Sequence, residues 1–457
     1  MIDFHMQQPT ICAIATPIGR GGVGVIRLSG KTACEIAKKL TKRTKDFTPR
    51  YAHFCRFYDD NGVILDEGLV LFFRAPHSFT GEDVVEIQGH GGMILQQQLL
   101  SRCYELGARQ AHAGEFSMRA FENNKMDLVQ AEAIADAIDA TSVAAARGAM
   151  RSLTGEFSKK INELLNKLIH LRLHVEAAID FPDEEDVDFL ADATITKQLN
   201  ALKTQVADVL FGAQQGQLLR DGVSVVIAGR PNAGKSSLLN RLAGTERAIV
   251  TDIAGTTRDI LQETLVLKGL ALNITDTAGL RNTEDVVEKA GIDRAKNAIA
   301  TADLVLLVYD VTVDHDPVLL AKELFGASPN PKNMLLIGNK TDKLKHIDDL
   351  PTDIEGFGLA YVSCETQSGL PQLVDKICEK VGFHPPENTL IARTRHLDAL
   401  KRVQVALNDA EQLHVYQAGE LMAESLRLAQ MNLSEITGEF SADDLLGKIF
   451  GSFCIGK

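Results

Sequence analysis

The sequence predicts a multidomain protein of the α/β plus α class, in which an α/β domain with a phosphate-binding loop is inserted into a helical domain. Three observations lead to this prediction. The chain has 457 residues, and about 150 residues per domain gives roughly three domains. Short apolar runs alternate with helical segments between about 221 and 382. Helical periodicity precedes and follows that stretch.

The first part of the chain is expected to form an α+β domain. Val70–Phe73 and Val84–Ile87 have the apolar character of strands, and Met93–Leu106 has the periodicity of a helix. Glycine-rich turns are expected at 19–24 and 88–92.

Helical segments follow and return near the end of the chain. Apolar residues recur at helical spacing around Leu128 and from Ile161 to Val175, and a break is expected at Pro182 beside an acidic cluster. We therefore predict an N-terminal domain over 1–122, a helical domain over 123–220 and 383–457, and the inserted domain over 221–382.

Composition limits the class of protein. Lys and Arg number 48 and Asp and Glu 61, so the net charge is 48 − 61 = −13, which argues mildly against a protein that coats RNA. No apolar run approaches the length of a membrane span, and Asp3 stands where a signal peptide would be basic. We therefore expect a cytoplasmic protein without a membrane segment. The seven cysteines form no C-x-x-C pair, which favours free thiols.

The strongest motif is a phosphate-binding loop. Residues 229–236 read G-R-P-N-A-G-K-S and match G-x-x-x-x-G-K-[ST] directly after the apolar run 223–228. Backbone N–H groups of such a loop surround phosphates, Lys235 would reach the β- and γ-phosphates, and the Ser236 hydroxyl would hold Mg²⁺.

Three further motifs follow in order. D-T-A-G at 276–279 offers an aspartate for a water-mediated Mg²⁺ contact and a glycine N–H for the γ-phosphate. N-K-T-D at 339–342 offers the Asp342 carboxylate to the guanine N1–H and amine, two donors that adenine cannot present together. Ser363–Glu365 would close the base pocket. Together these motifs predict GTP binding.

The residue after D-T-A-G is Leu280, which cannot orient an attacking water. Hydrolysis is therefore slow or uses another group. Glu284, Asp285 and Glu288 are the candidates, with Glu288 favoured, and the alternative is that all three are solvated loop carboxylates.

The motifs also suggest a binding site for a monovalent cation. The Asn232 amide oxygen could coordinate such an ion beside the β–γ bridge, or asparagine could simply favour the turn. In the stretch T-D-I-A-G-T-T-R-D at 251–259, the Thr257 hydroxyl suits Mg²⁺, and the Thr251 and Ile253 carbonyls could complete the cation site. Arg258 is either a charge-stabilising finger or a local partner of the next aspartate.

These motifs, with A-T-P-x-G-R-G-G-V-G near the N-terminus and F-C-I-G-K at the end, resemble the MnmE (TrmE) family of tRNA-modifying GTPases over essentially the whole chain. The resemblance implies an N-terminal domain for tetrahydrofolate binding and dimerisation, a discontinuous helical domain and a Ras-like P-loop G domain. It implies K⁺-stimulated GTP hydrolysis coupled to G-domain dimerisation. It also implies a homodimer that works with an FAD-dependent MnmG-type partner to add a carboxymethylaminomethyl or aminomethyl group at C5 of the wobble uridine of tRNA.

The resemblance also assigns residues. It gives Lys235 and Glu288 to catalysis, Ser236 and Thr257 to Mg²⁺, and Asn232, Thr251, Ile253 and Thr256 to K⁺. The residues expected to contact GTP are Asn232, Ala233, Gly234, Lys235, Ser236, Ser237, Thr251, Asp252, Ile253, Ala254, Gly255, Thr256, Thr257, Asp276, Thr277, Ala278, Gly279, Asn339, Lys340, Asp342, Ser363 and Cys364. Those expected to bind a 5-formyl- or 5,10-methylene-type tetrahydrofolate are Arg27, Glu86, Lys125 and Lys457. Cys454 is either a reactive thiol near the one-carbon donor or a packed residue.

Two other functions remain open. One is a ribosome-assembly GTPase resembling Era or Der, although the chain has one G-x-x-x-x-G-K-S match and no KH-like segment. The other is a folate-dependent one-carbon transferase with a GTPase regulator, which dependence on the FAD partner would distinguish.

Overall fold

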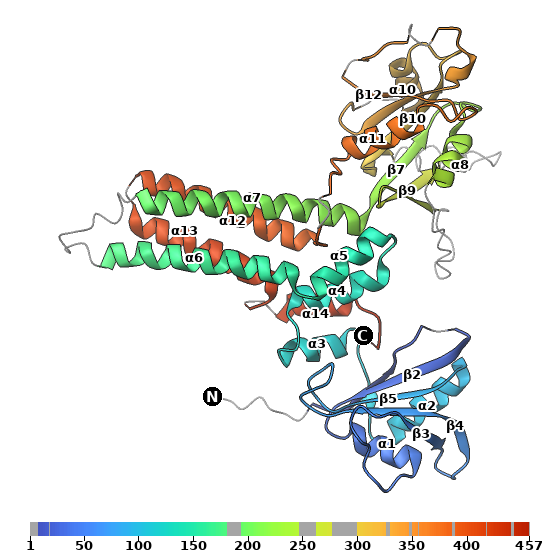
Figure 1. Cartoon of the computed structure of the whole chain (residues 1–457), viewed down its shortest axis with the longest axis vertical. Helices are drawn as coiled ribbons and strands as arrows, with labels where there is room; N and C mark the ends of the chain where they lie inside the picture. The colour runs from blue at the N-terminus through green and yellow to red at the C-terminus, as the bar shows by residue number, and fades with distance from the viewer. Residues whose placement is uncertain are drawn as a thin grey trace. The chain divides into compact units, whose positions relative to one another are not determined.

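The computed structural model describes residues 8–17, 19–180, 193–245, 262–276, 299–325, 330–346, 350–354, 356–385, 389–416, 418–439 and 443–456. The chain divides into two compact units, and most of its helices and strands are labelled in Figure 1. The first unit comprises Met1–Ala135 and Gln430–Lys457, and the second comprises Asp136–Ala429. Among the described residues, no helix combines the length and the apolar character needed to span a membrane.

The first unit contains a mostly antiparallel sheet, whose described strands follow the order β3-β4-β5-β2-β1-β6. They are β1 (Ile11–Ile14), β2 (Gly21–Ser29), β3 (His53–Tyr58), β4 (Ile64–Phe73), β5 (Val84–Gly91) and β6 (Arg109–Gln110). Only β1 and β6 pair in parallel among them. Helices α1 (Ala33–Thr41) and α2 (Met93–Glu105) share a buried apolar cluster with the sheet, which confirms the predicted α+β domain.

The glycine-rich stretches were wrongly predicted as turns, because most of their residues lie inside β2 and β5. Gly21 pairs with Gly91 across these strands. A Cβ on Gly91 would collide with the Gly21 carbonyl, and one on Gly24 would collide with the Gln96 side chain. The glycines therefore allow close approach of backbone and side chain within the sheet.

The end of the chain returns to the first unit. Here lie α3 (Glu115–Glu122), the first part of α4 (Leu128–Asp139), the last part of α13 (Gly419–Thr437), and α14 (Asp443–Gly451). Phe450 and Phe453 pack with Leu128 and Ala131 in one buried cluster. Burial of such aromatic side chains is worth roughly 2–3 kcal/mol each, so this contact is a substantial part of the unit's core.

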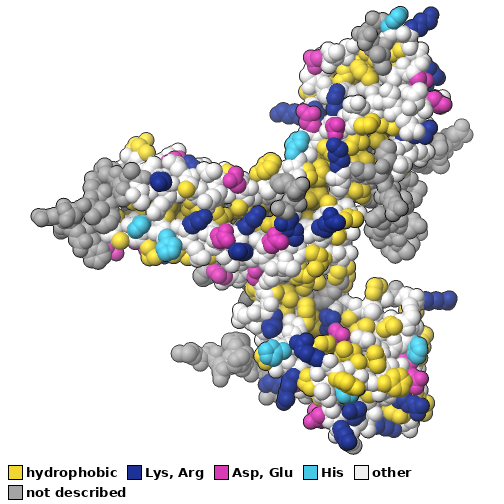
Figure 2. Space-filling model, in the orientation of Figure 1, with side chains coloured by type: hydrophobic (Ala, Val, Ile, Leu, Met, Phe, Trp, Pro, Cys, Tyr) yellow, Lys and Arg dark blue, Asp and Glu magenta, His cyan; other side chains and the backbone are white. Residues whose placement is uncertain are grey.

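The second unit has a helical part made of long helices. They are α5 (Val143–Leu153), α6 (Glu156–Asp180), α7 (Ala193–Asp221), α12 (Thr394–Val415) and the start of α13. The buried residues of α6 recur at helical spacing from Ile161 to Val175, and α7 packs against both α6 and α12. Charged side chains of both signs are scattered along the face of these helices that Figure 2 shows. The predicted helical segments on both sides of the inserted sheet are thus confirmed.

The inserted sheet lies between α7 and α12 in the sequence, and its described strands follow the order β12-β11-β10-β7-β9-β8. They are β7 (Val223–Ala228), β8 (Gln262–Leu267), β9 (Leu270–Asp276), β10 (Leu304–Asp310), β11 (Met334–Asn339) and β12 (Gly358–Tyr361). All neighbours are parallel except β8 and β9. The helices are α8 (Lys235–Thr245), α10 (Pro317–Phe325) and α11 (Leu370–Lys380). Separate apolar clusters cover the two faces, as a parallel sheet requires.

A buried carboxylate joins the two ends of this insertion. Asp136 on α4 accepts a hydrogen bond from Arg220 Nε at 2.8 Å and from Arg393 Nη2 at 2.7 Å. Arg220 lies in the last turn of α7, just before β7, and Arg393 directly precedes α12. Gln215 of α7 adds a second connection, because its amide bonds the backbone of Gly382 and His384. The chain therefore enters and leaves the inserted sheet beside one acidic side chain.

We expect Asp136→Ala to lower the free energy of unfolding of the second unit by roughly 3 kcal/mol, because two arginines lose a buried counter-charge. Asp398→Ala is the matched control, since Asp398 makes an exposed pair with Lys401 at 3.7 Å and such pairs are worth at most about 1 kcal/mol. Urea unfolding followed by far-UV circular dichroism measures both. An equal decrease in the free energy of unfolding for the two variants would contradict the stabilising role of the buried Asp136 carboxylate.

Candidate functional site

The predicted phosphate-binding loop connects the end of β7 to the start of α8. Lys235 Nζ, at the first position of α8, donates to the carbonyls of Gly229 at 2.9 Å and Arg230 at 3.0 Å. Gly234 has a φ of 100°, and a Cβ there would collide with the Asn339 side chain. The loop thus curves tightly before a helix N-terminus, where backbone N–H groups and the helix dipole favour an anion.

Asn339 connects this loop to the predicted base-binding segments. It ends β11, is 2% exposed, and donates from Nδ2 to the Ala233 carbonyl at 2.9 Å. Its Oδ1 accepts from the Cys364 N–H at 3.3 Å. The next residue, Lys340, donates to Asp310 at 2.6 Å. Burial alone would raise the pKa of Asp310, but hydrogen bonds led by that from Lys340 hold it below its usual value.

The base-closing loop is held from several sides. Ser363 Oγ donates to Asp342 Oδ1 at 2.5 Å and accepts from the Thr366 N–H at 3.1 Å. Burial raises the pKa of the Cys364 thiol, and the Cys364 carbonyl accepts from Arg241 Nε at 2.9 Å. The structure therefore brings together the phosphate loop, N-K-T-D and S-C-E motifs at one end of the sheet.

Three further predicted residues are placed by the structure: Asn232 is exposed in the loop with a φ of 64°, and Ser236 and Ser237 follow Lys235 at exposed positions of α8. The side chains of the other nucleotide-site predictions cannot be placed. Asp276 ends β9, and its backbone is in register with Ile227 of β7, close to the start of the phosphate loop. The predicted positions 251–257 and 277–279, with Arg258, Leu280, Glu284, Asp285 and Glu288, lie outside the described residues.

A second cluster gathers the residues predicted to bind folate. Arg27 on β2 pairs with Glu86 on β5 at 2.9 Å, and its guanidinium lies 5.3 Å from the centre of the Phe79 ring. Lys125 Nζ donates to the Pro76 carbonyl at 2.9 Å. Arg27 and Lys125 therefore contact the same short loop between β4 and β5.

The C-terminal segment lies against the same sheet. A Cβ on Gly456 would collide with the carbonyl of Ile14, at the end of β1. Cys454 is exposed, and its carbonyl accepts from the Gly114 N–H at 3.4 Å. Lys457 lies outside the described residues.

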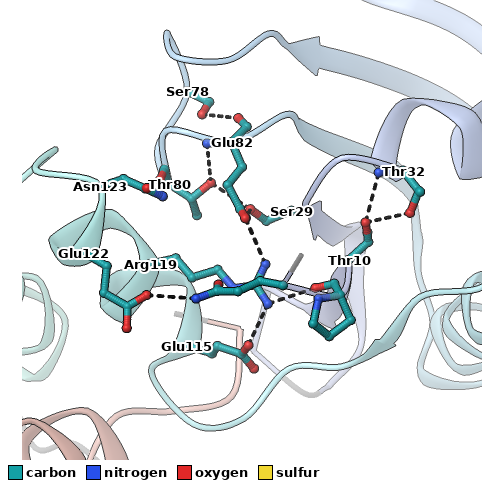
Figure 3. A network of polar contacts seen from close by, with 12 residues as sticks. Thr10, Ser29, Thr32, Ser78, Thr80, Glu82, Glu115, Arg119, Glu122 and Asn123 are labelled. Atoms are coloured by element: carbon teal, nitrogen blue, oxygen red, sulfur yellow. Dashed lines mark hydrogen bonds and ion pairs between the residues drawn. The ribbon is translucent and has the colours of Figure 1, made fainter. Parts of the chain in front are cut away.

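A buried arginine supports the loop that carries Phe79 (Figure 3). Arg119 on α3 is 1% exposed and donates to Glu82 at 2.9 Å, to Glu115 at 2.8 Å and to the Pro9 carbonyl at 2.9 Å. Glu82 also accepts from Ser29 Oγ of β2 at 2.6 Å. The network thus joins the start of the chain, β2, α3 and the loop.

Burial would raise the pKa of Glu115, the second carboxylate in this network. Hydrogen bonds from Arg109, the His112 N–H and Arg119 more than offset that effect and lower its pKa from 4.5 to about 2. The carboxylate is therefore a stable anion between two cations.

Reasoning from the sequence did not identify Arg241, Phe79 or Arg119. Arg241 and Phe79 stand outside every motif, and their partners are distant in sequence. Arg119 gave one weak signal, its i, i+4 spacing from Glu115, which is common on solvent-exposed helices as well.

Comparison with known proteins adds an independent result. Residues 10–125 match the family model described as the GTP-binding protein TrmE N-terminus, and residues 128–454 match that of the MnmE helical domain. A tRNA modification GTPase MnmE of Psychrobacter arcticus is 66% identical, covering 98% of this chain and 96% of the relative. Those of Acinetobacter baylyi (62% identical, 100% and 98% covered) and Stutzerimonas stutzeri (53%, 98% and 99%) are also similar over their whole length.

The depressed pKa of Glu115 predicts an acid-sensitive first unit. Its stabilising effect is complete above pH 4.5 and is lost as the pH falls towards about 2, since protonation then removes the anion. As the pH is lowered from 4.5 to about 2, we expect the melting temperature of Glu115→Gln to fall less than that of the wild type. Glu122→Gln, at an exposed position of α3, is the control and should follow the wild type. Parallel curves for all three proteins would contradict this assignment.

Gly234→Ala should weaken GTP binding by more than about tenfold, or roughly 1.4 kcal/mol. The added Cβ meets the Asn339 side chain and strains a positive φ. Gly244→Ala in α8 is the matched control, because nothing lies within 4 Å of its Cβ position. Titration with a fluorescent GTP analogue measures both affinities. An unchanged affinity in Gly234→Ala would show that this loop does not hold the nucleotide.

Proposed function

The chain belongs to the MnmE family of tRNA modification GTPases, and we propose that it acts as a K⁺-stimulated GTP hydrolase in the modification of the tRNA wobble uridine. One observation of the geometry carries this proposal. Asn339 holds the phosphate loop through Ala233 and the base-closing loop through Cys364. A bound GTP would contact the phosphate loop with its triphosphate and the base-closing loop with its guanine. Asn339 therefore sets the distance between the two loops that such a nucleotide must reach.

In the proposed reaction, the phosphate loop binds the triphosphate and Lys235 stabilises negative charge that develops at the β- and γ-phosphates. Its partners include the backbone carbonyls of Gly229 and Arg230, which an incoming phosphate can replace. Asp342 reads the guanine N1–H and amine. Other expected nucleotide contacts are Asn232, Gly234, Ser237, Lys340, Ser363 and Asp276. The expected contacts at 251–257 and 277–279 lie outside the described residues.

Two ions are proposed for this site. Ser236 and Thr257 supply hydroxyl oxygens, which suit Mg²⁺. The exposed Asn232 amide, with Thr251, Ile253 and Thr256, would hold K⁺ where positive charge helps the leaving phosphate. Glu288 would orient the attacking water. A hydrolysis rate that is equal in KCl and NaCl would contradict the K⁺ assignment.

A tetrahydrofolate derivative is proposed for the first unit. The Arg27–Glu86 pair offers a donor and an acceptor for the edge of a pterin, and Lys125 and Lys457 offer cations for a glutamate tail. The ring of Phe79 beside Arg27 provides an apolar wall. When bound, the folate supplies the one-carbon unit. Lack of binding of 5-formyltetrahydrofolate in calorimetry would remove this step.

The remaining parts of the proposal come from the family resemblance. The chain would form a homodimer through its first domain, couple hydrolysis to G-domain dimerisation, and work in the cytoplasm with an FAD-bearing MnmG-type partner on tRNA. The proposed domains are the N-terminal domain over 1–122, the helical domain over 123–220 and 383–457, and the G domain over 221–382. Similarity over the whole chain favours this function over a ribosome-assembly GTPase, because both family models belong to MnmE-type proteins.

Nucleoside mass spectrometry of tRNA tests the function. In bacterial cells that lack their own MnmE-type protein, the wild-type chain should restore the carboxymethylaminomethyl or aminomethyl group on wobble uridine. Lys235→Ala should not restore it, because the phosphates lose their cation, whereas the control Gly244→Ala should. An unmodified wobble uridine in cells with the folded wild-type chain would exclude this function.

A further inference from the structure

Arg241 connects the two ends of the candidate nucleotide site. It lies on α8, six positions after Lys235 and therefore about 9 Å further along the helix axis. Its Nε donates to the Cys364 carbonyl at 2.9 Å. The helix that begins at the phosphate loop thus also reaches the loop expected to close the base pocket.

Cys364 is held at both of its backbone polar groups. Its N–H donates to Asn339 Oδ1 at 3.3 Å, and its carbonyl accepts from Arg241. Asn339 in turn donates to the Ala233 carbonyl at 2.9 Å. These three contacts close a ring that runs through the phosphate loop, α8, the base-closing loop and β11.

We propose that Arg241 is a positioning residue of the guanine pocket, which fixes the backbone of Cys364 before the base arrives. This inference rests on the proposed function, since it takes guanine as the base. Ordering a loop residue costs free energy, and a loop that is already ordered binds its ligand more tightly. Because peptide groups are planar, holding the Cys364 carbonyl towards α8 also directs the Glu365 N–H to the opposite side of the loop.

Positioning and direct charge attraction predict different results. Arg241 acts through the Cys364 carbonyl and not through the phosphates, so its loss should weaken GDP and GTP binding by the same factor. If its charge attracted phosphate, GTP would lose more affinity than GDP, because GTP carries the larger negative charge. A lysine keeps a charged donor on a long stem and should restore most of the hydrogen bond.

The experiment measures the Kd of GDP and of a non-hydrolysable GTP analogue, together with steady-state hydrolysis, in the full-length protein. Arg241→Ala should raise both Kd values and the KM by about fivefold to tenfold, consistent with loss of one charged hydrogen bond, while kcat is unchanged. Arg241→Lys should restore affinity to within about twofold, which is less than 0.5 kcal/mol. Asn240→Ala, at the neighbouring exposed position of α8, controls for changes in the helix.

The outcomes separate this inference from the proposed function. If the wild type binds neither nucleotide, the proposed function fails. If the wild type binds both and Arg241→Ala binds equally well, or loses affinity for GTP alone, the positioning role is wrong. A fall in kcat with unchanged KM would also overturn it. Thermal unfolding of each variant confirms that the comparison is made between folded proteins.

Discussion

The arrangement of the second unit depends on the interaction between Asp136 and two arginines that are distant in sequence. Arg220 lies in the last turn of α7, which leads into the inserted sheet, and Arg393 directly precedes α12, which follows the sheet. An inserted domain with two covalent connections can still rotate about them if the connections are flexible. Here both connections meet the same buried carboxylate, so the two ends of the insertion are held next to each other.

In the candidate nucleotide site, a buried side chain likewise connects segments that are distant in sequence. Asn339 is a single buried amide that bonds two loops, and Arg241 completes the connection through α8. The loop that carries Phe79, beside the residues predicted to bind folate, is held in a similar way by Arg119 through Glu82. In both places a buried polar side chain, Asn339 or Arg119, holds loops that border the candidate site.

Local patterns in the sequence predicted much of this structure. The helices of the second unit follow from apolar periodicity, and the phosphate loop follows from a contiguous motif between a strand and a helix. The sequence did not predict contacts between distant residues: nothing near Asp136 identifies Arg220 and Arg393 as its partners. The strand glycines were misread because glycine permits both turns and close strand contacts, and only the neighbouring strand decides between them. The residues at 251–257, 277–279 and 288 stay predictions.

The return of the chain end to the first unit has a consequence for synthesis on the ribosome. Phe450 and Phe453 pack with Leu128 and Ala131, and Ile455 forms a bridge with Ala113. The cluster around Leu128 is therefore complete only after the segment with Phe450 and Phe453 has been translated, whereas the apolar cluster of the first sheet uses residues 12–108 alone. During that interval the apolar surface around Leu128 stays uncovered, while the inserted sheet, whose strands are all encoded between these two segments, can already fold.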